Sequence, residues 1–514
     1  MTAASGPPTG WDEDTHDPPA ATPGRAGNVP GDATSADRPR DATSANRPLD
    51  AKAADRPLDA TAADRPRSDA TADRPGDATA ADAPHRTRAA GAPPPARIGR
   101  SAGLRALLAS PAFLRLWSIG GCVNAMRWFE VLAAALFTLD ATGSDFAVAA
   151  VSAARTMPML LLGAFAGVMA EAVDRKRVVV IGQCVAAASS ASVALLAAFG
   201  LAQPWHVALA ALVSGTVWST EMSTRRRMVG ESVPPALVPR ALALDSMTNS
   251  GTRIIGPVLA GALYEFAGLA GAFAVSATVY VLAALLAVGL RHQQAIRRLV
   301  LSQVPRDLAE GVAFARGHTV VTGVLLVTIA MNLLGFPYSA LVAPIGQMHF
   351  GVSPALVGVM AASESIGAFL GGLWLAGGDP PGSGRPLMVG GSLLYLCCVA
   401  LMPLAPVFFA ACGLLILGGF GSAAFANMQT SLIIAHAPPH VRSRLMGLLT
   451  VCIGCGPVGI LLVGALANVL GPLRAVDAIE LAGLAAVVAA GLVWRRREQG
   501  RPAGTTREAW GEER

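Results

Sequence analysis

The stretch VPPALVPR, residues 233–240, runs directly into the apolar segment ALALDSMTNSGTRIIGPVLAGAL, which ends at residue 263. The same unit returns as APPHVRSR, residues 437–444, followed by LMGLLTVCIGCGPVGILLVGAL. In both copies two prolines precede an arginine at the same spacing, and a Gly-Pro pair, Gly256-Pro257 or Gly456-Pro457, follows inside the apolar segment. A loop and helix that recur after about two hundred residues predict a chain built from two equivalent halves.

The composition places the chain in a membrane. Of its 514 residues, 53% are hydrophobic and 14% are charged, and the mean hydropathy is +0.49. A soluble domain carries about 25% charged residues. Beyond residue 100 the sequence becomes a series of apolar runs of about twenty residues, the length that crosses a hydrocarbon core. We therefore expect an all-α integral membrane protein.

The apolar runs fall into two sets of six, which predicts about twelve transmembrane helices in two six-helix bundles. The predicted spans are 114–139, 146–169, 178–199, 205–222, 242–266 and 270–290, then 320–345, 356–375, 387–404, 408–434, 445–470 and 476–493. The predicted domains are a tail at 1–104, a bundle at 105–290, a linker at 291–318 with an amphipathic helix, a bundle at 319–497 and a tail at 498–514. Duplicated bundles in so apolar a chain are typical of transporters.

The N-terminal tail repeats a nine-residue unit from residue 32, DATSADRPR and then DATSANRPL. It has almost no large apolar side chains, so it cannot bury enough surface to offset its chain entropy and is expected to be disordered. It is either a partner-binding segment or a dispensable extension.

The arginines predict the topology. With the N-terminus in the cytoplasm, nearly all loop arginines are cytoplasmic, and only Arg474 lies outside. We expect a multi-pass protein of the plasma (inner) membrane with both termini in the cytoplasm. The net charge of +6 is explained by these loops. A nucleic-acid partner is not expected, because no basic stripe interleaves with exposed aromatic residues.

The sequence does not predict an enzyme. It contains no GxSxG, HExxH or phosphate-binding P-loop motif and no histidine-rich cluster, so neither a metal nor a cofactor is expected. Cys452 and Cys455 have the spacing of a redox motif, but they lie in a predicted span beside glycines and are interpreted as small residues at a helix contact.

One predicted cytoplasmic loop reads GAFAGVMAEAVDRKR, residues 163–177. It resembles the loop signature of the major facilitator superfamily. The matching positions are Gly163, Gly167, Asp174, Arg175 and Arg177. Glu171 takes the place of the usual Asp, and Ala172 the place of the usual Arg. The resemblance implies a gate in which these charges pair across the two bundles in one conformation only; close helix packing and topology are the alternative explanation.

Three further segments carry the resemblance. GTRIIGPVLAG, residues 251–261, is similar to the fifth-helix motif of antiporters and exporters in that superfamily. TRRRMVGESVP, residues 224–234, and RDLAEGVAFAR, residues 306–316, resemble the branch that includes the enterobactin exporter. The prolines at 257 and 457 are expected to bend or loosen helices that must rock.

Ionisable residues inside the predicted spans are the candidate coupling residues, because a charge at mid-membrane costs about 2.5–3.5 kcal/mol on insertion scales. They are Arg127, Glu130, Arg155, Arg253 and Glu364. We hypothesise that Glu130 exchanges protons and that Arg127 or Arg155 tunes it. A static ion pair between Glu130 and either arginine is the alternative, and Glu364 is the second candidate.

The resemblance and the charges together predict a proton-driven exporter of small amphipathic molecules, of the drug or siderophore type, that works by alternating access. Lipid or lysophospholipid movement and a non-transporting sensor or scaffold are the alternatives. The expected partners are a small-molecule substrate, protons and the bilayer, and the protein is expected to be monomeric.

Overall fold

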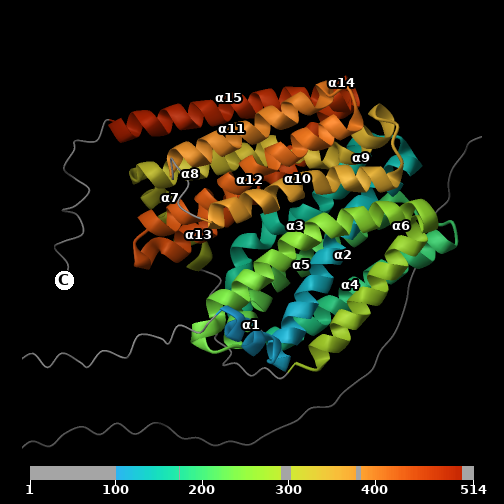
Figure 1. Ribbon diagram of the computed structural model, residues 1–514, viewed down its shortest axis with the longest axis horizontal. Helices are drawn as coiled ribbons and strands as arrows, with labels where there is room; N and C mark the ends of the chain where they lie inside the picture. Colours follow the sequence, from blue (N-terminus) through green and yellow to red (C-terminus); the bar gives the residue numbers. More distant parts are fainter. Residues whose placement is uncertain (1–99, 173, 291–302, 378–383, 500–514) are drawn as a thin grey trace, which may run out of the picture. The chain divides into compact units, whose positions relative to one another are not determined.

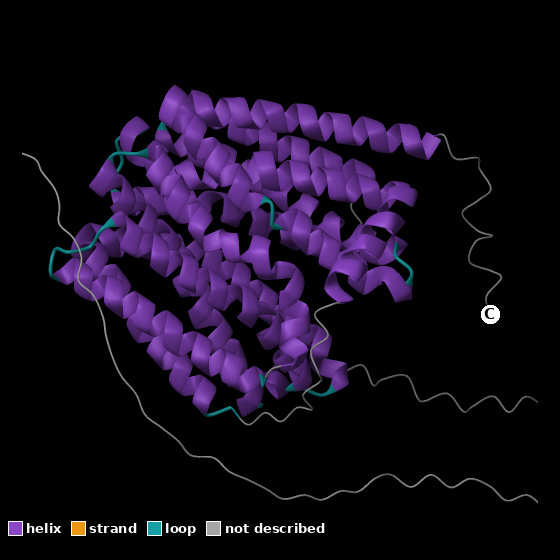
Figure 2. Cartoon of the chain, turned by 180° about the vertical axis from the view of Figure 1, so that it is seen from behind, coloured by secondary structure: helices purple, strands orange, loops and turns teal. Residues whose placement is uncertain are grey.

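The computed structural model describes residues 100–172, 174–290, 303–377 and 384–499, and every regular element in these ranges is a helix (Figures 1 and 2). The repeats of the N-terminal tail, the first part of the predicted linker and the last 15 residues lie outside the described residues. The predicted all-α class is confirmed for the described part of the chain.

The first half of the chain is made of long helices. They are α1 (Arg100–Leu108), α2 (Pro111–Thr142), α3 (Asp145–Ala172), α4 (Arg175–Ala198), α5 (Pro204–Glu231), the short 3-10 helix η1 (Pro235–Leu237) and α6 (Val238–Val288). In α2 the hydroxyl of Ser110 accepts a hydrogen bond from the amide of Phe113, and Pro111 occupies the first turn, where its missing N–H costs nothing. Gly143 ends the helix at φ 59°, a left-handed conformation that favours glycine.

Helix α6 consists of two membrane-spanning arms. Its 51 residues would extend about 75 Å if straight, more than twice the hydrocarbon thickness. Gly268 leaves the helical conformation at φ 59° and ψ −162°, and two arms meet near the α6 label in Figure 1. The predicted boundary between spans at residues 266–270 therefore corresponds to a glycine turn.

The second half contains shorter and more interrupted helices. They are α7 (Gln303–Gly317), α8 (Thr319–Ala330), η2 (Met331–Gly335), η3 (Phe336–Leu341), α9 (Val342–Pro344), η4 (Ile345–His349), α10 (Pro354–Ala376), α11 (Arg385–Leu401), η5 (Met402–Leu404), α12 (Phe408–His436), α13 (Pro439–Ile453), α14 (Gly456–Leu470) and α15 (Pro472–Gln499). η2 and η4 are π-helical, whereas η3 and η5 are 3-10 helices. The span predicted at 320–345 therefore changes helix type several times along its length.

Ten helical segments in the described residues are long and apolar enough to cross a membrane. One of them, Pro235–Val288, is divided by Gly268 into two arms. Helix α5 is not among the ten, but it packs beside α3 and α4. Counting both arms and α5 gives the twelve predicted crossings. The polar Ser214, Thr216 and Ser219 in α5 explain why its hydropathy is lower.

The most extensive contacts between the two halves are those of α6 with α10 and of α3 with α14. Within the first half α2 packs most extensively against α6, and within the second half α12 packs against both α10 and α11. Outward faces keep large apolar side chains exposed, such as Ile181, Leu195 and Leu285, as expected of a surface that faces lipid. The bundle thus encloses its polar residues and presents an apolar exterior.

Candidate functional site

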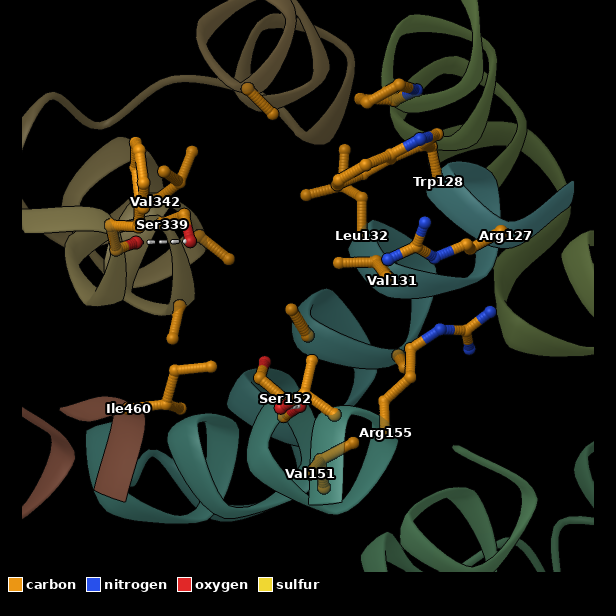
Figure 3. Close-up of a pocket in the computed structure, with 18 of the residues that line it drawn as sticks. Arg127, Trp128, Val131, Leu132, Val151, Ser152, Arg155, Ser339, Val342 and Ile460 are labelled. Carbon is orange, nitrogen blue, oxygen red and sulfur yellow. Dashed lines mark hydrogen bonds between the residues drawn. The ribbon is translucent and has the colours of Figure 1, made fainter. Parts of the chain in front are cut away.

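A cavity of about 250 Å³ lies between the two halves (Figure 3). The first half contributes α2, α3, α5 and α6, and the second half contributes η3, α9, α10 and α14. Most of the wall is apolar. Four charged residues line it, namely Arg127, Arg155, Arg253 and Glu364. The cavity therefore combines an apolar surface with a few polar groups that converge on it, as ligand sites do.

Glu130 is held in a buried ion pair. Both guanidinium nitrogens of Arg155 donate to Oε2 of Glu130, at 3.2 and 3.3 Å, and the hydroxyl of Ser190 donates to Oε1 at 2.6 Å. Glu130 is 1% exposed and does not line the cavity, whereas Arg155 does. Arg155 in α3 therefore connects the cavity wall to a carboxylate behind it.

Arg127 lies one helical turn before Glu130 on α2 but does not pair with it. Its guanidinium carbon lies 3.5 Å from the ring centroid of Trp218 and 4.8 Å from that of Trp128. Figure 3 shows its guanidinium pointing toward the centre of the cavity, while that of Arg155 turns aside. Of the two arginines considered as partners of Glu130, the structure brings Arg155 to it and leaves Arg127 stacked on tryptophans.

Arg253 and Glu364 approach each other across the two halves. Nη2 of Arg253 in α6 lies 3.8 Å from Oε1 of Glu364 in α10, and the hydroxyl of Tyr338 donates to Oε2 of Glu364 at 2.9 Å. The guanidinium of Arg253 also lies 4.8 Å from the ring of Trp128. A long ion pair that joins both halves is an interaction that rocking of the halves would break.

Sequence reasoning missed the position of Glu480 in α15. Glu480 is 0% exposed, and neither of its carboxyl oxygens has a hydrogen-bond partner among the described residues. Only its place four residues after the start of the last predicted span, 476–493, signalled burial. Glu480 lies within electrostatic range of Glu364 and Tyr338.

The gate-loop residues lie at the junction of α3 and α4. Gly163, Gly167 and Glu171 fall in the last turns of α3, and their part in a gate stays a prediction. The carboxylate of Asp174 caps α4 by accepting from the amides of Lys176 and Arg177. The guanidinium of Arg177 also contacts Asp174 at 3.4 Å in an exposed pair.

Arg175 donates to both carboxylate oxygens of Glu231, at 2.6 and 2.7 Å. Glu231 ends α5, so this ion pair joins two helices of the same half. Pairing of the loop charges across the halves stays a prediction. Among the other charges, Arg225 pairs with Asp245, and Glu221 accepts a hydrogen bond from the side-chain amide of Gln183.

The two Gly-Pro pairs lie in different surroundings. α6 is helical through Gly256 and Pro257, whereas the chain leaves the helix after Ile453 and resumes at Gly456, with Pro457 in the first turn of α14. Pro257 lines the cavity, and Ile460, one turn beyond Gly456, does so from the other half. Helix bending at these sites stays a prediction.

Comparison with known proteins gives consistent matches. A family model described as "transmembrane secretion effector" matches residues 102–513. The multidrug efflux pump Tap of Mycolicibacterium fortuitum is 25% identical over 392 residues, covering 73% of this chain and 94% of Tap. The macrolide efflux protein A of Streptococcus pyogenes is 26% identical over 275 residues, covering 51% of this chain and 65% of that protein.

Solved structures show the same fold. A bacterial homologue of the human lysosomal transporter Spinster, inward-facing and unoccupied, superposes with a TM-score of 0.61 at 14% identity, covering 76% of this chain and 98% of that one. A POT family transporter in complex with 5-aminolevulinic acid gives a TM-score of 0.59 at 11% identity, covering 75% and 96%. The narrower resemblance to the enterobactin exporter stays a prediction. The family match, the relatives and the fold together show that this chain is a multi-pass membrane transporter of the major facilitator superfamily, and that it belongs to the transmembrane secretion effector family.

Proposed function

We propose that the protein is a proton-driven exporter of amphipathic molecules that works by alternating access. The observation that carries this proposal is the buried ion pair of Glu130 and Arg155, since Arg155 belongs to the cavity wall and Glu130 lies behind it. A substrate that draws Arg155 away removes the cation from Glu130 and favours its protonation. Proton uptake and substrate binding are thereby coupled through one side chain.

Export and the plasma membrane are supported by the relatives, two of which are named as efflux pumps. The apolar cavity wall supports amphipathic cargo over sugars. We keep the expected orientation, with both termini in the cytoplasm, and a monomeric protein as part of the proposal. Lipid transport and a sensor role stay predictions.

The test is proton flux in proteoliposomes that contain the full chain and a pH-sensitive dye, with a panel of amphipathic compounds, macrolides included, as substrates. In Glu130→Gln, substrate-driven proton flux should fall at least about tenfold, because the amide has no proton to exchange. Ser190→Ala is the graded control, since it keeps the carboxylate and removes only one hydrogen bond. Unchanged flux in Glu130→Gln together with its loss in Glu364→Gln would assign coupling to Glu364 and contradict the proposal.

A further inference from the structure

The charged residues around the cavity do not balance. Three arginines line it, and the two nearest carboxylates that form ion pairs, Glu130 and Glu364, are engaged by Arg155 and Arg253. Arg127 remains: within the described residues no carboxylate lies at ion-pair distance from it, and its guanidinium makes no hydrogen bond there. The positive charges of Arg155 and Arg253 lie close enough to Arg127 to repel its own positive charge. The cavity therefore holds one positive charge in excess.

Glu480 does not neutralise this excess. It does not line the cavity, and within the described residues it makes neither a hydrogen bond nor an ion pair with any arginine. The unbalanced cation thus stays with Arg127.

The position of Arg127 is fixed by the rings around it. Stacking on Trp218 and Trp128 covers the faces of the flat guanidinium and holds it in place. The N–H groups lie in the plane of the guanidinium, so they stay available to donate to a ligand. Trp128 also lies under Arg253, so two guanidinium groups share one aromatic ring at the same 4.8 Å distance. A planar carboxylate or a phosphate placed there receives paired N–H donors from a preorganised arginine.

We propose that the cavity selects amphipathic organic anions and that Arg127 is the residue that binds the anionic group. The apolar part of such a molecule contacts Leu132, Val151 and Phe336 in the cavity wall. This inference rests on the proposed export function and names its substrate class. An anion at Arg127 also lies near Arg253, and it competes with Glu364 for that arginine across the two halves.

The experiment measures equilibrium binding to the purified full chain in nanodiscs of phosphatidylcholine. The radiolabelled probes share one naphthalene ring and differ only in charge: 2-naphthylacetate, 2-naphthylacetamide and 2-naphthylmethylammonium. The acetate should bind at least about tenfold more tightly than the amide, and the ammonium most weakly. Arg127→Gln should lower the affinity for the acetate to that for the amide, and Arg127→Lys should restore part of the difference.

Arg226→Gln is the matched control, because it removes the same charge from an exposed position of α5. Equal affinity of the wild type for acetate and amide overturns the proposal. An equal loss of affinity for the acetate and the amide in Arg127→Gln also overturns the proposal, since that result assigns Arg127 a purely structural role. If added phosphatidylglycerol displaces the acetate probe, the site is supported and its ligand is a lipid anion. If phosphatidylglycerol does not displace the probe, the ligand is a free organic anion. Because binding needs no proton gradient, this result is independent of the flux measurement on Glu130.

Discussion

The same Gly-Pro pair folds differently in the two halves of this transporter. In the first half, α6 continues through Gly256-Pro257, and Gly256 lies so close to α2 that an added Cβ would be 2.8 Å from Cβ of Trp128 and 3.0 Å from the carbonyl oxygen of Ala125. In the second half, the helix stops before Gly456-Pro457, and a Cβ on Gly456 would meet nothing within 4 Å. An identical dipeptide is therefore a packed position in one half and an open helix start in the other.

The break before α14 faces a second break. A Cβ on Gly459 would overlap the carbonyl oxygen of Leu333 and lie 2.6 Å from Cγ of Pro337. Leu333 belongs to the π-helical η2 and Pro337 to the 3-10 helix η3. The second half thus places irregular backbone of η3 against the cavity, whereas the first half places Arg127, Glu130, Arg155 and Arg253 on continuous α-helical stretches, with Arg253 in the arm of α6 that precedes Gly268.

This contrast teaches a division of roles. A regular α-helix satisfies its own backbone hydrogen bonds, so it can carry a charged side chain inside the membrane without exposing polar backbone. Backbone that changes helix type is tolerated in a membrane only where protein surrounds it or it lines a cavity. The irregular segments satisfy this condition in different ways: η3 lines the cavity through Phe336 and Tyr338, whereas η2 is surrounded by protein, with Met331, Asn332 and Gly335 buried.

The largest expected effect concerns the contact between halves. A Cβ on Gly358 of α10 would overlap the carbonyl oxygen of Pro257, so Gly358→Leu should keep α6 and α10 apart and reduce transport at least about tenfold. Spin labels on Phe266→Cys and Val469→Cys, with the exposed Cys184 and Cys397 replaced by Ser, should report a longer distance than in the parent.

Gly372→Leu is the control, because it adds the same side chain to the same helix at a position with open space. If Gly358→Leu transports at the parent rate, the close contact at Pro257 has no role in the cycle. The different packing of the two Gly-Pro pairs would then matter for folding and not for transport.

The second prediction compares the duplicated glycines directly. Gly256→Ala should lower the free energy of unfolding by about 1–3 kcal/mol, because the methyl group must displace the backbone of α2. Gly456→Ala should be neutral or slightly stabilising, because alanine favours a helix over glycine and the site has room. Both variants are measured by thermal unfolding in detergent. Unfolding is monitored through the reaction of the newly exposed cysteines with a thiol dye. Equal losses in the two variants would show that the motif is packed alike in both halves.

The sequence was sufficient for the fold but not for the pairing of charges. Apolar run length and the duplicated loop predicted twelve crossings, because both follow from bilayer thickness and from composition. The sequence allows an ion pair of Glu130 with either Arg127 or Arg155. Which arginine reaches Glu130 depends on how α3 and α4 pack against α2, since Arg155 and Ser190 come from those helices. No local pattern contains that information.

The Gly-Pro motif and Glu480 illustrate the same limit. Proline at 257 and at 457 has the same local chemistry, but the glycines at 454, 456 and 459 make the second segment easier to interrupt, and its neighbours decide the outcome. The position of Glu480 near the start of the last predicted span does not decide whether its side chain is buried. Its complete burial follows from the contacts of α15 with α8 and α11, which come from elsewhere in the chain.

The smallest expected effect concerns the arginine of the second loop copy. Arg444 donates to Asp307 at 2.9 Å and lies 2.9 Å from Glu310, so it ties α13 to α7. These pairs are partly exposed, and such pairs contribute about 0.2–1 kcal/mol each. Arg444→Gln should therefore speed amide exchange in residues 303–317 only a fewfold and leave global unfolding unchanged. In 1 M salt the difference from the parent should vanish, because the Debye length falls to about 3 Å. A change that persists in high salt, or that spreads beyond α7 and α13, would mean that Arg444 supports the bundle through packing, as Gly256 does in the first half, and not through charge.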